Sequence, residues 1–150
     1  MALDPVVAAK RLCKISNWTI SNLKLQKLLY LAHLMYLGRT GKPLICDQFE
    51  AWEYGPVVPS LYHKVKIFGS DPISDIFHSV PDADDSTETE YLNAAYKSLS
   101  NLPAGKLVAI THWADGAWAK SYEKGARNRK ISNEDIMDEY SARTPTSTDT

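Results

Sequence analysis

Hydrophobic residues recur at helical spacing between Leu23 and Gly41, in the segment LKLQKLLYLAHLMYLGRTG. One set falls at i, i+3, i+4 and i+7, the spacing that lines one face of an α-helix: Leu25, Leu28, Leu29, Ala32, Met35 and Tyr36. Other apolar residues widen this face, which leaves few positions to meet water: Lys24, Gln26, Lys27, His33 and Arg39. A helix that is apolar on most of its circumference is buried on most of it. We therefore predict a central helix, capped by Ser21 or Asn22 and ended by Gly41.

The rest of the first half contains shorter elements. Asp4 followed by Pro5 is typical of a helix start, and we predict a helix from about Pro5 to Lys14. Partial alternation of apolar residues then predicts a short strand near Gln48 to Tyr54, and Gly55-Pro56 is a turn signal. Pro59 lies where a first-turn proline belongs, so another helix is expected to begin there.

The second half is predicted to be helical after one long loop. Prolines and an acidic cluster between Ser70 and Glu90 predict an exposed loop. The helices that follow are marked, in chain order, by Thr87 with Glu90 as a capping box, Pro103, the surroundings of Trp118, and Ser132 with Asp135.

These patterns predict a mostly α, compact single-domain helical fold around a central hydrophobic helix, with a small β-strand pair or hairpin. The domain is expected to span residues 1–141, and residues 142–150, which lack an apolar anchor, are expected to form a disordered tail. A chain of 150 residues with 44% hydrophobic content can bury a core without a disulfide or a metal.

Cysteine usage and the lack of a visible targeting segment indicate a cytoplasmic protein. Cys13 and Cys46 show no CxxC pairing, so we expect two free thiols in a reducing compartment. The N-terminal segment does not resemble a secretory signal, and we expect no membrane partner.

Catalytic and metal-binding motifs are not apparent. The four histidines lack the spacing of a zinc site, and no nucleophile elbow or phosphate-binding glycine loop is present. His112 could be imagined as a general base near Glu53, but a partly buried histidine that bonds a backbone carbonyl is the favoured interpretation. We predict no catalytic residue, no metal, no cofactor and no enzyme activity.

Aromatic and small residues form the best candidate binding site. Rigid aromatics beside a backbone turn are good interface anchors, and the set comprises Tyr30, Trp52, Tyr54, Gly55, Pro56 and Trp118. Trp52 could equally pack on the central helix, whereas Tyr54 is expected to be reachable. Lys27 and Glu53 could form an internal ion pair or contribute to a binding rim.

A local basic run supports a different function. It comprises Lys120, Lys124, Arg127, Arg129 and Lys130. Clustered cations neutralise phosphates, so a nucleic-acid-binding regulator that uses the stretch around Lys120 to Lys130 is the alternative. The formal net charge of −1 and the nearby acidic loop provide no long-range attraction to DNA, and no helix-turn-helix pattern accompanies the run. Nucleic-acid binding is therefore expected to be weak or absent.

Three sequence blocks resemble a known family. They are KLQKLLYLAH at Lys24–His33, EAWEYGPVVPSLYHKVKIFG at Glu50–Gly69 and ITHWADGAWAKSYEKG at Ile110–Gly125. Their order and spacing resemble the signature blocks of the Panacea domain, the SocA-like antitoxin family, often described as phage-associated. The resemblance implies an antitoxin that neutralises a cognate toxin encoded nearby through direct contact. It also implies that the three blocks form one partner-binding surface that includes His112 and Trp118.

Overall fold

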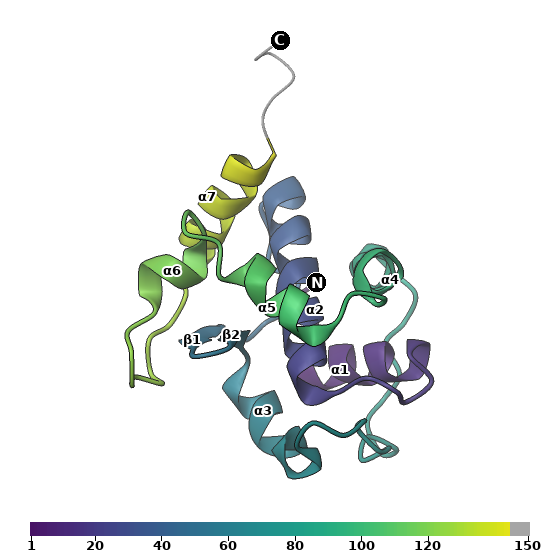
Figure 1. Cartoon of the computed structure of the whole chain (residues 1–150). Coiled ribbons are helices and arrows are strands. Elements are labelled where there is room, and N and C mark those ends of the chain that lie inside the picture. The colour runs from purple at the N-terminus through teal and green to yellow at the C-terminus, as the bar shows by residue number, and fades with distance from the viewer. Residues whose placement is uncertain (145–150) are drawn as a thin grey trace.

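The computed structural model describes residues 1–144. In chain order its elements are α1 (Pro5–Ile15), α2 (Asn22–Thr40), β1 (Glu50–Trp52), β2 (Gly55–Val57), α3 (Pro59–Val65), the 3-10 helix η1 (Lys66–Phe68), α4 (Thr87–Leu99), α5 (Ala104–Thr111), α6 (Ala117–Ser121) and α7 (Asn133–Arg143). Figure 1 shows the helices arranged around α2, and the small hairpin between α2 and α6. The mostly helical fold with one two-stranded sheet is thus confirmed for this part of the chain.

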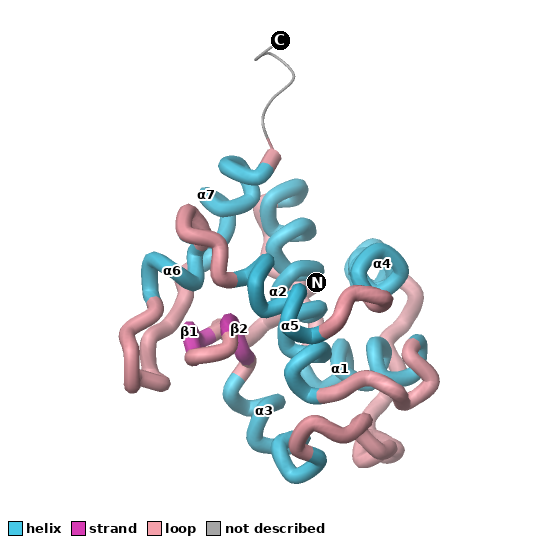
Figure 2. Tube along the Cα trace, in the orientation of Figure 1, coloured by secondary structure: helices cyan, strands magenta, loops and turns pink. Residues whose placement is uncertain are grey.

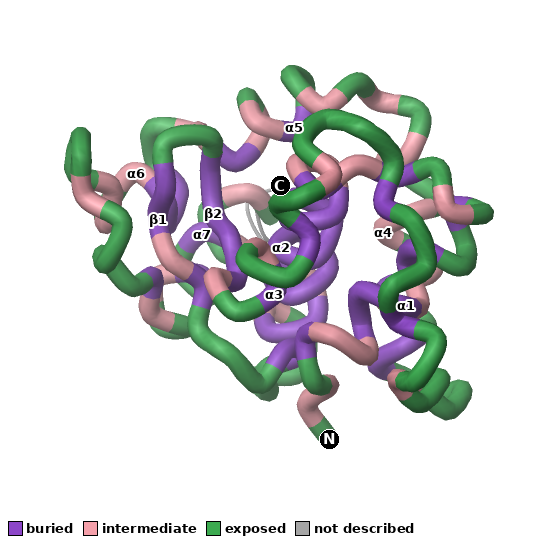
Figure 3. Tube along the Cα trace, turned by 90° about the horizontal axis from the view of Figure 1, so that it is seen from below, coloured by how far each residue is buried: buried purple, intermediate pink, exposed green. Residues whose placement is uncertain are grey.

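Helix α2 is the centre of the core, as its apolar pattern predicted. It contacts α1, α4, α5 and α7, and Figure 3 shows it buried over most of its length. Leu25, Leu28 and Leu29 have no exposed surface. Of the two predicted caps it is Ser21 whose hydroxyl accepts the Lys24 N–H, and Gly41 ends the helix in the left-handed conformation at φ 74°.

Three of the α2 residues that were expected to meet water are instead buried. Gln26, Lys27 and His33 are each no more than 1% exposed. The prediction was wrong because each side chain has a polar partner on a distant segment, which compensates for its removal from water. For example, the Ile45 N–H donates to His33 Nδ1 at 3.2 Å, and His33 Nε2 lies 3.1 Å from the Asn133 side-chain oxygen.

The two strands form a tight antiparallel hairpin, drawn in magenta in Figure 2. Trp52 pairs with Gly55, so Gly55 and Pro56 belong to β2, and the turn consists of Glu53 and Tyr54. The predicted turn at Gly55-Pro56 was therefore misplaced by two residues. The outer edge of β1 is covered by residues 129–131, whose main chain exchanges hydrogen bonds of 2.8 Å with Phe49 and Ala51.

The helices begin within a residue or so of the predicted positions, but the residues that cap them are not always the predicted ones. Asp4 caps α1, and the Ser132 hydroxyl accepts the Asp135 N–H at the start of α7. The capping box of α4 is formed by Ser86 with Thr89 rather than by Thr87 with Glu90. The register differs by one residue because the two hydroxyls reciprocally satisfy the backbone N–H groups at positions 86 and 89.

The loop between η1 and α4 is mostly exposed, as expected, but two of its apolar side chains anchor it. Ile73 and Phe77 are at most 1% exposed, and the Ile73 N–H donates to the Ile20 carbonyl at 2.9 Å. At the other end of the chain, α7 continues to Arg143, two residues beyond the predicted domain end at 141. Residues 145–150 of the predicted tail lie outside the described residues.

Both cysteines are free thiols, with Cys13 buried and Cys46 exposed. Among the helices of residues 1–144, none is both long and apolar enough to cross a membrane.

Candidate functional site

The first turns of α2 hold the hairpin through two buried polar side chains. The Gln26 side-chain oxygen accepts the Val58 N–H at 2.9 Å, and the Lys27 ammonium donates to the Pro56 carbonyl at 2.6 Å. Gln26 and Lys27, which are adjacent in α2, thus bind a backbone N–H and a backbone carbonyl of β2 and the residue that follows it. The hairpin is fixed to the central helix by these bonds as well as by apolar packing.

Lys27 occupies a space that only a glycine in β2 leaves open. A Cβ atom at position 55 would lie 2.7 Å from the Lys27 Cε atom and 2.7 Å from the Thr111 hydroxyl oxygen. Gly55 also has φ 110°, a conformation that other residues rarely adopt. Burial lowers the pKa of the Lys27 ammonium to about 7, because the charged form loses its hydration. The predicted alternative of a Lys27–Glu53 ion pair is not formed, because the ion pairs within residues 1–144 do not include Lys27 and its ammonium donates to the Pro56 carbonyl instead.

Trp118 connects α6 to the other strand of the hairpin. Its indole N–H donates to the Trp52 carbonyl at 2.7 Å. The Trp118 ring stacks on His112 with 3.7 Å between ring centroids, and on Tyr122 with 4.5 Å. Burial and the positive charge of Lys27 lower the pKa of His112, while a hydrogen bond to the Glu53 main chain acts in the opposite direction. Within residues 1–144, His112 Nε2 has no hydrogen-bond partner.

Tyr30 belongs to a buried network that sequence reasoning missed. Its hydroxyl donates to Glu139 Oε1 at 2.7 Å, and the same oxygen accepts the Ala117 N–H at 3.0 Å. The other carboxylate oxygen accepts from Arg143 Nε at 2.7 Å. Glu139 has no exposed surface and ties α7 to α2 and α6. Its position three residues after Ile136, on the buried face of α7, was a signal that could have identified it.

The structure brings the predicted site residues together, but mostly below the surface. Gly55 and Pro56 are buried with Lys27 and Tyr30, whereas Trp52 and Trp118 are 7% and 9% exposed. Trp52 thus packs inward, the alternative left open for it. Tyr54 is 62% exposed at the tip of the hairpin, as predicted. The cluster is therefore a buried support that presents the turn residues Glu53 and Tyr54.

A pocket of about 320 Å³ lies beside the hairpin turn, between α2, η1 and the segment that follows α6. We call it the hairpin pocket, and its lining includes Lys27, Trp52, Glu53, Tyr54, Lys66 and Arg127. The Arg127 guanidinium carbon lies 4.6 Å from the centre of the Trp52 ring, and the Trp52 indole N–H donates to the Arg127 carbonyl at 3.1 Å. Arg127 is thus held at the pocket by its side chain and its main chain.

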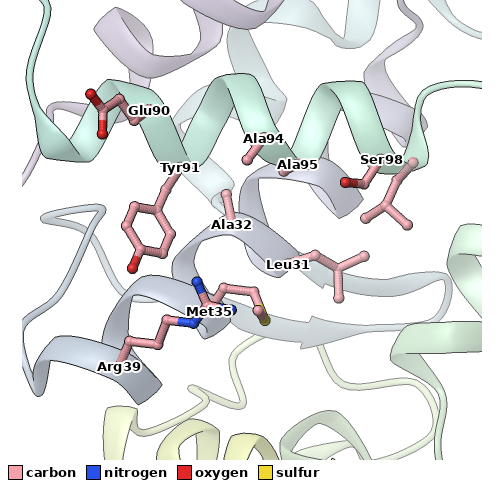
Figure 4. A pocket seen from close by; sticks show the side chains of 10 residues that line it. Leu31, Ala32, Met35, Arg39, Glu90, Tyr91, Ala94, Ala95 and Ser98 are labelled. Carbon is pink, nitrogen blue, oxygen red and sulfur yellow. The ribbon is translucent and has the colours of Figure 1, made fainter.

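A second and more apolar hollow of about 570 Å³ lies between α2 and α4. We call it the α2–α4 groove. Figure 4 shows Leu31, Met35 and Arg39 of α2 facing Tyr91 of α4, with the small side chain of Ala95 farther along. Its lining is largely aliphatic and aromatic, with Arg39 and Glu90 as the charged members. The groove offers contact area without a converging set of polar groups.

The basic run is partly neutralised by acidic neighbours. Lys120 lies 3.9 Å from Asp138, and Arg129 lies 3.6 Å from Glu123. With Arg127 placed over the Trp52 ring, three of the five cations in the run contact other side chains of the protein. Such a run attracts phosphates less than its sequence suggests.

Comparisons with known proteins support the family resemblance that the three sequence blocks indicated. Residues 25–119 match the sequence model of the family described as "Antitoxin SocA-like, Panacea domain". Over 109 residues the chain is 35% identical to "Antitoxin SocA" of Caulobacter vibrioides (strain NA1000 / CB15N), an alignment that covers 66% of this chain. The aligned part spans 58% of the length of that relative. No solved structure matches the chain. The match spans α2, the hairpin, and the helices through α6 that support it, so this chain belongs to the SocA-like, Panacea-domain antitoxin family.

Proposed function

We propose that this protein is a cytoplasmic antitoxin of a bacterial or phage-borne module, and that it neutralises a cognate toxin encoded nearby by binding it directly. Family membership supports the antitoxin role. The observation that supports the binding mechanism is the hairpin tip, where Tyr54 is exposed on a turn fixed from below by Gln26, Lys27 and Trp118. A pre-organised aromatic side chain loses little entropy on binding, so it is a good anchor for a protein interface.

The proposed mechanism is binding rather than catalysis. The Thr111 hydroxyl, which adjoins His112 in the sequence, donates to the Val108 carbonyl at 2.9 Å. The His112 ring is stacked against Trp118. These contacts serve packing, and an interface of at least about 1,000 Å² around the hairpin would suffice to occlude a toxin.

Co-expression tests the proposal. The product of the neighbouring open reading frame is expressed with and without this protein, and growth and co-purification are measured. We expect the neighbouring product to stop growth alone, and to be harmless and co-purify when both proteins are present. A harmless neighbour, or toxicity that persists beside well-folded protein, would contradict the proposed function.

A further inference from the structure

Positive side chains from three separate parts of the chain converge on the hairpin pocket. Lys27 comes from α2, Lys66 from η1, and Arg127 from the segment between α6 and α7. The ion pairs found in residues 1–144 involve other cations, so none of these three has a carboxylate oxygen within ion-pair distance. The acidic residue of the lining is Glu53, which is exposed in the turn. The pocket therefore has an excess of positive charge.

The walls of the pocket suit a single anionic side chain. Trp52 and Tyr54 provide aromatic surface next to the cations, and the Arg127 guanidinium is positioned over the Trp52 ring. The Arg127 guanidinium makes no hydrogen bond to other groups of residues 1–144, so its N–H donors can bind a carboxylate in a bidentate manner. Lys27 lies beneath this surface without exposed area, so it acts on a bound anion through its field in a medium of low polarity.

We propose that the hairpin pocket receives a carboxylate side chain of the toxin, which pairs with Arg127 and Lys66 while the buried Lys27 reinforces the attraction. This contact presupposes the proposed toxin binding, and the carboxylate in the hairpin pocket would be at the centre of that interface. A toxin segment with an Asp or Glu next to an apolar residue is the expected occupant, because the apolar neighbour packs on Tyr54.

The arrangement of charges favours a protein carboxylate over nucleic acid. A duplex presents many phosphates in a row, and proteins that bind it neutralise several of them along a surface. Here the cations surround one hollow of about 320 Å³, and the acidic side chains of Glu50 and Glu53 lie on the same hairpin. These carboxylates repel an extended polyanion but leave room for one anionic group.

Proton uptake provides a signature for the role of Lys27. Since its pKa in the free protein is about 7, a nearby carboxylate raises that pKa, and binding above pH 7 then takes up a proton. The charged or titratable groups around it are Glu53, Tyr54, Tyr62, Lys66, Arg127 and His112. The pKa of His112 is lowered from an ordinary value of 6.5, which is below this window. Affinity is therefore expected to be constant below pH 7 and to weaken as the pH rises above it.

Calorimetric titration of the purified protein with the neighbouring gene's product tests the proposal. Arg127→Glu and Lys66→Glu should each weaken binding about tenfold or more. Lys64→Glu is the matched control, because Lys64 is also exposed near η1 but does not line the pocket, and it should change affinity less than about twofold. Lys27→Met should weaken binding below pH 7 and abolish the loss of affinity above pH 7, without lowering Tm by more than a few degrees.

A charge swap identifies the partner group. Single Asp or Glu residues on the toxin are changed to Lys, and one of these variants should bind Arg127→Glu well while it binds the wild-type protein and Lys64→Glu poorly, because both of these keep the Arg127 cation. Restoration by none of them, or wild-type affinity of Arg127→Glu, would overturn the carboxylate contact while leaving toxin neutralisation intact. Ser98→Glu, which places a charge in the α2–α4 groove, should bind normally. A toxin that fails to bind the wild-type protein would overturn the proposed function as well.

Discussion

At the scale of single residues, the charge of Lys27 makes the stability of the fold depend on pH. Its pKa is about 7 in the folded protein and about 10.4 in an unfolded chain, so the unfolded state binds more protons between these values. The free energy of unfolding should therefore rise with pH from 7 towards 10, relative to a Lys27→Met variant, by about 1.4 kcal/mol per pH unit. Denaturant unfolding of both proteins from pH 7 to 9 measures this difference, because groups common to both proteins cancel. A difference that stays constant with pH would show that the ammonium is hydrated.

Tyr54 and Trp118 are expected to respond differently to truncation. Tyr54 is 62% exposed and its hydroxyl makes no hydrogen bond to residues 1–144, so Tyr54→Ala should leave Tm nearly unchanged while it weakens toxin binding by about 2 kcal/mol or more. Trp118→Ala removes a buried ring and the hydrogen bond to Trp52, so Tm and binding should fall together. Thermal melts and binding titrations on the same samples test this contrast. Parallel losses in both variants would make Tyr54 structural.

The residue pattern identified the apolar core but not the buried polar groups. Leu25, Leu28 and Leu29 were placed correctly because helical spacing alone specifies their face. Lys27 was assigned to the surface because its acceptor, the Pro56 carbonyl, is 29 residues away in the chain. Local spacing contains no information on such a partner, whereas the cost of burial is decided by it.

At the scale of elements, the hairpin depends on the absence of a side chain at Gly55. Gly55→Ala should destabilise the protein by more than the roughly 1–3 kcal/mol that an unfavourable backbone conformation costs, because the added Cβ also meets Lys27 and Thr111. Gly125→Ala is the matched control, since Gly125 also has positive φ but its Cβ would meet nothing within 4 Å. Chemical denaturation of both variants measures the contribution of the close approach. Equal losses would contradict the tight fit around Lys27.

The central helix should be intolerant of charge on its apolar face. Leu28→Asp places a carboxylate where the wild-type side chain has no exposed surface, at an expected cost of several kcal/mol against a typical stability of about 5–15 kcal/mol. Thermal unfolding measures the effect, and Lys24→Asp on the partly exposed side of the same helix should lose less. A Leu28→Asp protein that melts near the wild-type temperature would contradict the central place of α2.

The starts of the helices could be predicted more accurately than the position of the hairpin turn. Helix starts followed from Asp4, Pro59 and Ser132, because caps and first-turn prolines act within a few residues. The hairpin turn was misplaced because Gly-Pro usually marks a turn, whereas here Gly55 is required by a packing contact with α2 and α5. A local propensity was overridden by tertiary structure.

At the scale of the whole molecule, the three sequence blocks form a single unit. Lys27 from the first block, Pro56 from the second and Trp118 from the third are joined through the hairpin by hydrogen bonds of 2.6 and 2.7 Å. The resemblance predicted that these blocks meet, and the structure adds that Gln26, Lys27 and Trp118 hold the hairpin from below through hydrogen bonds. Around these bonds, Tyr54 and the hairpin pocket are the parts of the unit open to a partner, so we place the candidate contact surface there.

The distribution of charge over the whole molecule distinguishes the antitoxin from a nucleic-acid-binding regulator. The formal net charge is −1, and Lys120 and Arg129 of the basic run already contact Asp138 and Glu123. We therefore expect the isolated protein to bind its own promoter DNA no more tightly than unrelated DNA. The apparent dissociation constants should be in the non-specific range of about 10⁻⁴ to 10⁻⁶ M, weakening steeply as salt rises.

Fluorescence anisotropy with promoter and scrambled duplexes, at several salt concentrations, measures this expectation. Lys124→Ala combined with Lys130→Ala should reduce the salt slope of any DNA binding and leave toxin binding unchanged, because neither residue lines the hairpin pocket. Arg127→Glu should do the reverse and mainly weaken toxin binding. Binding to the promoter that is at least about a thousandfold tighter than to scrambled DNA would favour the regulator, since that ratio is typical of sequence-specific recognition.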